Sequence, residues 1–132
     1  MPIRVTYNDD RVVCYDNFNK ITDNINVIKI NCNNNNLTSL PANMNYPNLT
    51  RFYCSNNNLT SLPDNMIFPN LKHFNCSDNN LTSLPDNMNF PNLRYLHCHH
   101  NKLYYIPPHI NCYISTDDMT KSPEYMRRKI WI

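Results

Sequence analysis

The amino-acid sequence predicts an α/β solenoid, a single domain at residues 1–132 in which about four units of 22 residues stack between two caps. The string LTSLP occurs at residues 37–41, 59–63 and 81–85, and a degenerate copy, LYYIP, occurs at residues 103–107. Four cysteines keep the same step of 22 residues, at positions 32, 54, 76 and 98. The chain contains no Gly and is rich in Asn, which also tolerates the left-handed backbone of tight turns. A fixed period with Asn-rich turns indicates stacked repeats.

The four units share one pattern, LxxFxCxxNxLxxLPxxMxFPN, and begin at Val27, Leu49, Leu71 and Leu93. This pattern resembles the leucine-rich repeat, because it reproduces the LxxLxLxxNxLxxL frame of that family four times. The repeat region is also similar to the Asn-rich leucine-rich-repeat proteins of giant viruses that infect amoebae (mimivirus-like proteins). The resemblance implies a right-handed superhelix with a parallel β-sheet on its concave side and a mostly irregular or 3₁₀ convex side.

Both ends of the chain depart from the repeat, as the caps of a solenoid should. In the N-terminal cap, residues 1–26, two apolar stretches at 3–7 and 12–15 flank a polar turn and predict a hairpin laid over the first repeat strand. The repeats occupy residues 27–110. In the C-terminal cap, residues 111–132, Ser122, Pro123 and Glu124 form a helix start signal, which predicts a short terminal helix.

Each repeat is expected to contribute one short strand, centred on Phe52 to Cys54 and their equivalents. Apolar and polar residues alternate there, which is the pattern of a half-buried strand. The inward residues are Ile30, Cys32, Phe52, Cys54, Phe74, Cys76, Leu96 and Cys98. The return limbs would complete the core with Met44, Tyr46, Met66, Phe68, Met88, Phe90, Ile110 and Cys112. Because the limbs are rich in Pro, extended or short 3₁₀ segments are expected in them rather than helix.

One Asn recurs at the end of each predicted strand, at Asn35, Asn57, Asn79 and Asn101. The resemblance implies that these residues form a buried ladder whose side chains bond to the backbone of adjacent turns. A buried amide needs partners and stacked turns supply them, so the role expected for this ladder is structural.

The six cysteines are interpreted as reduced thiols. Four of them recur at one inward position, where a free thiol packs as a small apolar side chain, and no CxxC pair occurs. The N-terminal residues lack the apolar run of a signal peptide, and no apolar run is long enough to span a membrane. The sequence therefore predicts a cytoplasmic protein that is not secreted, acting in the host cytoplasm if it is viral.

The side chains that alternate with the core residues point away from the core, where ligands usually bind in leucine-rich-repeat proteins. The resemblance thus implies a non-catalytic module that binds a partner protein on its concave face, a host protein if the chain is viral. Tyr, Arg and His are good interface residues. The predicted partner-binding residues are Lys29, Arg51, Tyr53, His73, Asn75, Tyr95, His97, His99 and His100.

Catalysis and metal binding have less support in the sequence. No nucleophile motif occurs, and a Gly-rich phosphate loop cannot form in a chain without Gly. His97 and His99 alternate along one strand, and a third ligand for a metal could come from His73 or Asp78. The spacing requires neither of these, so the sequence predicts no metal and no cofactor.

The main alternative is a structural protein that associates with itself through an open sheet edge and exposed aromatics, Tyr104, Tyr105 and Trp131. A metal-binding or nucleic-acid-binding module is a distant third. The formal net charge of +2, from 12 basic and 10 acidic residues, predicts no general attraction to nucleic acid or to a membrane. The basic run at residues 127–129 is interpreted as the solvated face of the terminal helix.

Overall fold

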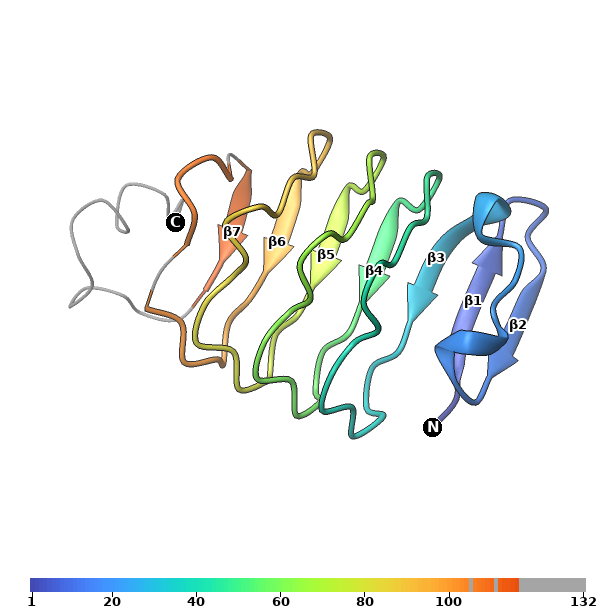
Figure 1. Cartoon of the computed structure of the whole chain (residues 1–132), viewed down its shortest axis with the longest axis horizontal. Coiled ribbons are helices and arrows are strands. Elements are labelled where there is room, and N and C mark those ends of the chain that lie inside the picture. The colour runs from blue at the N-terminus through green and yellow to red at the C-terminus, as the bar shows by residue number, and fades with distance from the viewer. Residues whose placement is uncertain (105, 111, 117–132) are drawn as a thin grey trace.

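A computed structural model describes residues 1–104, 106–110 and 112–116, which form a solenoid around one seven-stranded sheet (Figure 1). The strands lie in the order β2-β1-β3-β4-β5-β6-β7. Their bounds are β1 Ile3–Tyr7, β2 Val12–Tyr15, β3 Val27–Asn31, β4 Arg51–Tyr53, β5 His73–Asn75, β6 Tyr95–His97 and β7 Tyr113–Ser115. Two 3₁₀ helices, η1 Phe18–Lys20 and η2 Asn24–Asn26, connect β2 to β3. The terminal helix predicted after Ser122 lies outside the described residues.

The N-terminal hairpin is confirmed. β1 pairs antiparallel with β2, and its other edge pairs antiparallel with β3, which places Val5 opposite Ile30. Asp10 closes the turn in the left-handed region, at φ 69°, and its N–H donates to the carbonyl of Tyr7 over 3.0 Å. The hairpin therefore occupies the edge of the first repeat strand, which would otherwise offer unpaired backbone groups to another chain.

From β3 onward the sheet is parallel, and the predicted fold class is confirmed. Equivalent residues 22 positions apart lie side by side, so that Lys29 pairs with Arg51, Arg51 with His73, and His73 with Tyr95. β7 continues the sheet beyond β6, with Tyr113 beside Tyr95. This strand lies within the segment assigned to the C-terminal cap, and the sequence pattern did not single it out.

The return limbs are irregular, as predicted, and are built from Asn turns. Asn43 and Asn65 adopt φ values of 60° and 62°, and a second set of residues with positive φ follows the strands. Four residues of this second set keep the 22-residue step, Asn34, Asn56, Asp78 and His100, and Asn36 also belongs to it. A single isolated bridge, between Asn45 and Ile67, joins two limbs in the described part of the chain. Asn thus makes the turns for which many proteins use Gly.

The core is a double row of aromatic rings behind the sheet. Phe52 and Phe74 stack with their ring centroids 5.6 Å apart, as do Phe68 and Phe90 behind them. The rows meet edge to face, at 5.4 Å between Phe52 and Phe68. All eight inward strand residues predicted from the sequence are fully buried, and seven of the eight return-limb residues are buried, with Cys112 half-buried. The predicted alternation of inward and outward residues is therefore correct.

The thiols of the repeat position lie inside this core. Burial raises the pKa of the Cys32 thiol to about 12, and that of Cys54 and Cys76 well above the ordinary value. These thiols consequently stay protonated at neutral pH, and a protonated thiol is a poor nucleophile and metal ligand. Their position and protonation fit a packing role.

The amide side chain of Asn57 connects two turns. Its Nδ2 donates to the carbonyls of Cys32, at 3.1 Å, and Cys54, at 3.0 Å, while its Oδ1 accepts from the N–H groups of Asn35 and Leu37. Asn79 and Asn101 repeat this arrangement one and two turns further on. Each amide thus satisfies buried backbone groups of its own turn and of the preceding one. The prediction is wrong for Asn35, which is half-buried and whose Nδ2 donates within its own turn, to the carbonyl of Asn33 over 2.9 Å, because it lies in the first repeat.

A second Asn ladder, which sequence reasoning missed, lies at the end of the return limbs. The side chains of Asn48, Asn70 and Asn92 donate to the carbonyls of Ile25, Pro47 and Pro69, at 2.7, 2.7 and 2.9 Å. These residues are exposed, so each bond contributes less than a buried one. The PN sequence that ends the first three repeats was the available signal.

We expect Phe74→Ala to lower the free energy of unfolding by roughly 3 to 5 kcal/mol, because it opens a cavity beside the rings of Phe52 and Phe90 in a central repeat. Urea titration of the full chain measures this loss. Tyr95→Ala, which removes a ring that is 41% exposed, serves as the control and should cost less than about 1 kcal/mol. Equal losses would show that inward and outward positions are misassigned.

We expect Asn79→Ala to destabilise the fold by about 2 to 4 kcal/mol, because it leaves buried carbonyls and the N–H of Leu59 without their partner. Asn35→Ala changes the equivalent residue of the first repeat, where Nδ2 donates to the carbonyl of Asn33 and the side chain is half-buried. This variant should lose about 1 kcal/mol or less. The comparison uses the same urea titration, and a smaller loss for Asn79→Ala than for Asn35→Ala would contradict the role given to the ladder.

Candidate functional site

The outward side chains of the parallel strands form three columns, whose surface we call the sheet face. The first column is Lys29, Arg51, His73, Tyr95 and Tyr113. The second is Asn31, Tyr53, Asn75, His97 and Ser115. The third follows the strands and contains Asn33, Ser55, Ser77 and His99. Because neighbouring strands lie about 4.8 Å apart, side chains within a column are in contact range of one another.

Ring contacts order the first column. The ring of His73 stacks on that of Tyr95 with centroids 4.9 Å apart and 15° between their planes, and Tyr95 meets Tyr113 edge to face at 6.0 Å. The ammonium group of Lys29 lies 5.3 Å from the centroid of the Tyr53 ring. These contacts hold exposed and half-exposed side chains in place before any ligand binds.

Several polar side chains of the second and third columns form hydrogen bonds that stabilise the turns after the strands. Asn75 Oδ1 accepts from the N–H of Ser77 at 3.0 Å and from its hydroxyl at 2.6 Å, and Ser77 is buried. Asn33 Oδ1 likewise accepts from the N–H of Ser55 at 2.7 Å. The predicted binding residue Asn75 therefore also stabilises the turn after its strand.

The sheet face carries cationic side chains. Besides Lys29 and Arg51, the columns are flanked by Lys72 and Arg94, one repeat apart just before β5 and β6. Within the part of the chain that the structure describes, the acidic residues lie elsewhere. They are Asp9, Asp10, Asp16 and Asp23 in the N-terminal segment, Asp64 and Asp86 in the return limbs, and Asp78 in the turn after β5. A small net charge thus conceals an unequal distribution of charge.

Two histidines of this face have shifted pKa values. Burial, followed by the charge of Arg51, lowers the pKa of His73, with further contributions from His97, Arg94 and Lys72. Burial, followed by the charge of His99, lowers the pKa of His97. Both imidazoles are therefore neutral at physiological pH and add positive charge to the face when the pH falls.

The last two predicted residues lie at the end of β6. His99 Nδ1 is 3.4 Å from the hydroxyl of Ser115, at the border of the sheet face. His100 adopts a left-handed backbone with φ 55° and lies in the turn beyond the columns, where its Nδ1 is 2.8 Å from Asp78 Oδ1. The structure thus brings Lys29, Arg51, Tyr53, His73, Asn75, Tyr95, His97 and His99 onto one surface and places His100 at its margin.

Sequence reasoning missed several residues of this surface, among them Tyr113, Ser115, Lys72 and Arg94. Tyr113 follows Tyr95 by 18 residues rather than 22, so the repeat search did not find it. The signal was the alternation of Tyr113, Ile114 and Ser115, which matches that of β6. Lys72 and Arg94 do keep the 22-residue step, at the position before the strand.

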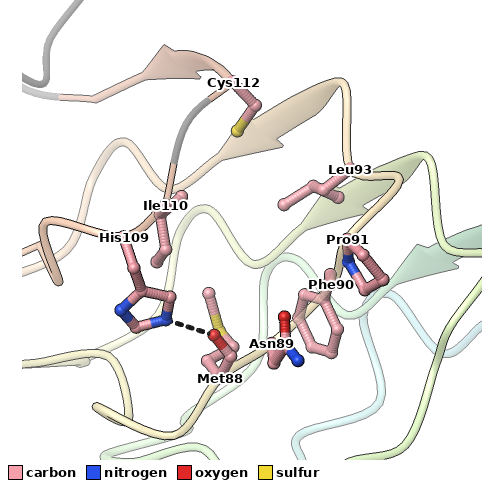
Figure 2. Close-up of a pocket in the computed structure, with 8 residues that line it drawn as sticks. All are labelled: Met88, Asn89, Phe90, Pro91, Leu93, His109, Ile110 and Cys112. Carbon is pink, nitrogen blue, oxygen red and sulfur yellow. Dashed lines mark hydrogen bonds between the residues drawn. The ribbon is translucent and has the colours of Figure 1, made fainter.

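A cavity of about 220 Å³ opens between the return limb of the third repeat and the segment before β7 (Figure 2). The residues that line it are Met88, Asn89, Phe90, Pro91, Leu93, His109, Ile110 and Cys112. The ring of His109 donates from Nε2 to the carbonyl of Met88 over 2.6 Å. Burial raises the pKa of the Cys112 thiol, which also lines the cavity, to about 11. The cavity therefore holds no thiolate at neutral pH, and its imidazole is engaged with the backbone. It offers no arrangement for nucleophilic catalysis.

Among the described residues, no helix has the length and apolar character needed to cross a membrane. A family model described as two copies of leucine rich repeats matches residues 69–108, and a model described as a leucine rich repeat matches residues 48–68. Together the matches extend from the second predicted unit to the fourth. No curated protein matches the chain. No solved structure matches it either.

The lowered pKa values of His73 and His97 predict that folding becomes less stable as the pH falls. Because the folded state disfavours protonation of these two imidazoles, the unfolded chain binds protons more readily below about pH 6.5. The free energy of unfolding therefore decreases as the pH falls from about 6.5 toward the pKa values of the two histidines in the folded state. We expect the double variant His73→Gln, His97→Asn to lose less stability between pH 7 and pH 5 than the native chain. Urea titrations at both pH values measure the difference. His109→Asn, a change on the return limb, should behave as native, and a double variant as acid-sensitive as the native chain would refute the assignment.

Proposed function

Because the chain is a leucine-rich-repeat protein, we propose that it is a non-catalytic interaction module whose sheet face binds an acidic segment of a partner protein. Leucine-rich repeats are generally protein–protein interaction modules, and solenoids present extended surfaces to their partners. The observation that carries the proposal is the composition of the sheet face. It combines cationic side chains with stacked aromatic rings, on strands whose opposite face is completely buried.

Charge complementarity supports an acidic partner. Arg51, Lys72 and Arg94 lie along three successive repeats, and Lys29 extends this row to the first. The carboxylates of the described residues lie in the N-terminal segment, in the return limbs and in the turn after β5. Exposed charges contribute little affinity individually, but they steer association and reject partners of the same sign. An acidic segment lying across the strands would meet all four cations.

The aromatic side chains supply the anchors. Tyr95 is 41% exposed and Tyr113 is 49% exposed, yet their rings are held by contact with each other and with His73. A ring that is already ordered loses little conformational entropy on binding, so more of its contact energy appears as affinity. Tyr and Arg are also the residues most often found to dominate binding energy. Arg51, Tyr53, Tyr95 and His97 are accordingly the proposed centre of the interface.

From the resemblance of its Asn-rich repeat sequence to proteins of giant viruses, we further propose that the chain is viral, that its partner is a host protein and that binding takes place in the host cytoplasm. The raised pKa values of the buried Cys54 and Cys76 thiols are compatible with a non-catalytic role, because a protonated thiol is a poor nucleophile. Self-association is the second candidate. It is favoured by the exposed rings of Tyr104 and Tyr113 and by the position of β7 as the last strand of the described sheet.

We expect alanine substitution of Arg51, Tyr53, Tyr95 or His97 to weaken partner binding by more than about 1 kcal/mol each. The partner is captured on the immobilised full chain from a lysate of the host cell, then purified, and its affinity is measured by calorimetry at two salt concentrations. Asp64→Ala and Asp86→Ala, in the turns of the return limbs, are the matched controls and should change the affinity by less than about 0.5 kcal/mol. Higher salt should weaken binding, because the attraction between the cations and an acidic segment is screened.

Other outcomes separate the alternatives. If the return-limb variants lose affinity and the sheet-face variants keep it, the partner binds another surface and the proposal is wrong. Recovery of nucleic acid in place of protein would assign the same cationic and aromatic face to a different class of ligand. A chain that forms oligomers in a concentration-dependent manner in sedimentation, and that Tyr104→Ser or Tyr113→Ser makes monomeric, would favour self-association.

A further inference from the structure

Three metal-ligating side chains meet in the turns that follow β5 and β6. Asp78, His99 and His100 each offer one ligand atom, and these three atoms all lie within 4.8 Å of one another. His100 Nδ1 is 2.8 Å from Asp78 Oδ1, and the imidazole rings of His99 and His100 lie edge to face with their centroids 4.9 Å apart. We propose that these residues bind a divalent transition-metal ion of the class that prefers imidazole ligands, with Zn²⁺ as the ion to test.

The 22-residue register of the repeats brings two of these side chains together. Asp78 and His100 are equivalent residues of successive repeats, and both adopt the left-handed backbone, with φ values of 54° and 55°. The same position in the first two repeats holds Asn34 and Asn56, whose side chains also bond to each other. Stacked turns therefore bring side chains at this position together whatever their chemistry. At the third and fourth repeats the paired side chains are a carboxylate and an imidazole, both of which bind metal.

His99 completes the ligand set. Its equivalents in the first three repeats are Asn33, Ser55 and Ser77, so an imidazole replaces a small polar side chain immediately beside the Asp78–His100 pair. The hydroxyl of Ser115 lies 3.4 Å from His99 Nδ1 and holds the ring, as outer hydrogen-bond partners do for metal-bound histidines. Two histidines from one turn and a carboxylate from the preceding turn are therefore arranged by the backbone before an ion arrives.

The donor set selects the class of ion. Two imidazoles and one carboxylate are typical ligands of Zn²⁺ and its neighbours, whereas Ca²⁺ and Mg²⁺ require more oxygen ligands than this turn supplies. Asp78 and His100 are exposed and His99 is half-buried, so water can fill the remaining coordination positions. Without an ion, the His100–Asp78 contact is an exposed pair of the kind that contributes little to stability. An ion would instead crosslink the third and fourth repeats.

The test uses the full chain, freed of any histidine tag and treated with a chelator. Zn²⁺ is titrated by calorimetry at neutral pH in the presence of a phosphine reductant, and the thermal unfolding midpoint is measured with and without the ion. We expect one ion per chain and a midpoint that rises with Zn²⁺ concentration, because binding to the folded state stabilises it. Asp78→Asn, His99→Ser and His100→Asn should each weaken binding at least about tenfold and abolish the rise.

These substitutions introduce residues that other repeats carry at the same positions, so the fold should be retained, and urea titration without metal checks this. His109→Asn is the matched control: it also removes one histidine in favour of the residue that the preceding repeat carries, Asn87, and it should leave Zn²⁺ binding unchanged. The proposal is overturned if the native chain shows no saturable binding below about 1 mM. It is equally overturned if the three variants bind as the native chain does, which would place the ion elsewhere.

Discussion

One amide side chain in each of the second, third and fourth repeats makes the interaction on which the rest of the structure depends. Asn57, Asn79 and Asn101 each donate to carbonyls of their own turn and of the preceding turn, and accept from the N–H of a residue in the preceding repeat. Buried backbone groups without partners would cost free energy, so successive turns stack where these bonds form. The resulting 22-residue register aligns the strands, the aromatic rows of the core and the columns of the sheet face.

A fixed register makes the chemistry of the surface depend on the few positions that vary between repeats. Down the first column the residues change from Lys29 and Arg51 to His73 and then to Tyr95 and Tyr113. In the turns after the strands, Asn and Ser give way to His in the fourth repeat. The ring contacts of the sheet face and the histidine cluster are consequently concentrated toward the C-terminal repeats, on a scaffold that hardly changes along the chain.

Much of this structure follows from the period of the sequence, and the remainder depends on contacts that a period does not encode. The hairpin of β1 and β2, the inward residues such as Phe52 and the outward columns were predicted, because alternation and spacing reveal them. β7 was not, because the last unit is shortened by four residues relative to the 22-residue step. The burial of Ser77 results from its bonds to Asn75, which alternation cannot show.

Hydrogen exchange at individual backbone amides tests the central role of the Asn ladder most directly. The N–H groups of Leu59 and Leu81 donate to the side chains of Asn79 and Asn101 in the following repeat, each over 3.0 Å. If these bonds hold the repeats together, the two amides exchange as slowly as those of Cys54 and Cys76, which donate to carbonyls of the neighbouring strand. Exchange of Leu59 and Leu81 at the rate of an exposed turn amide such as that of Asn65, while Cys54 and Cys76 stay protected, would contradict the account.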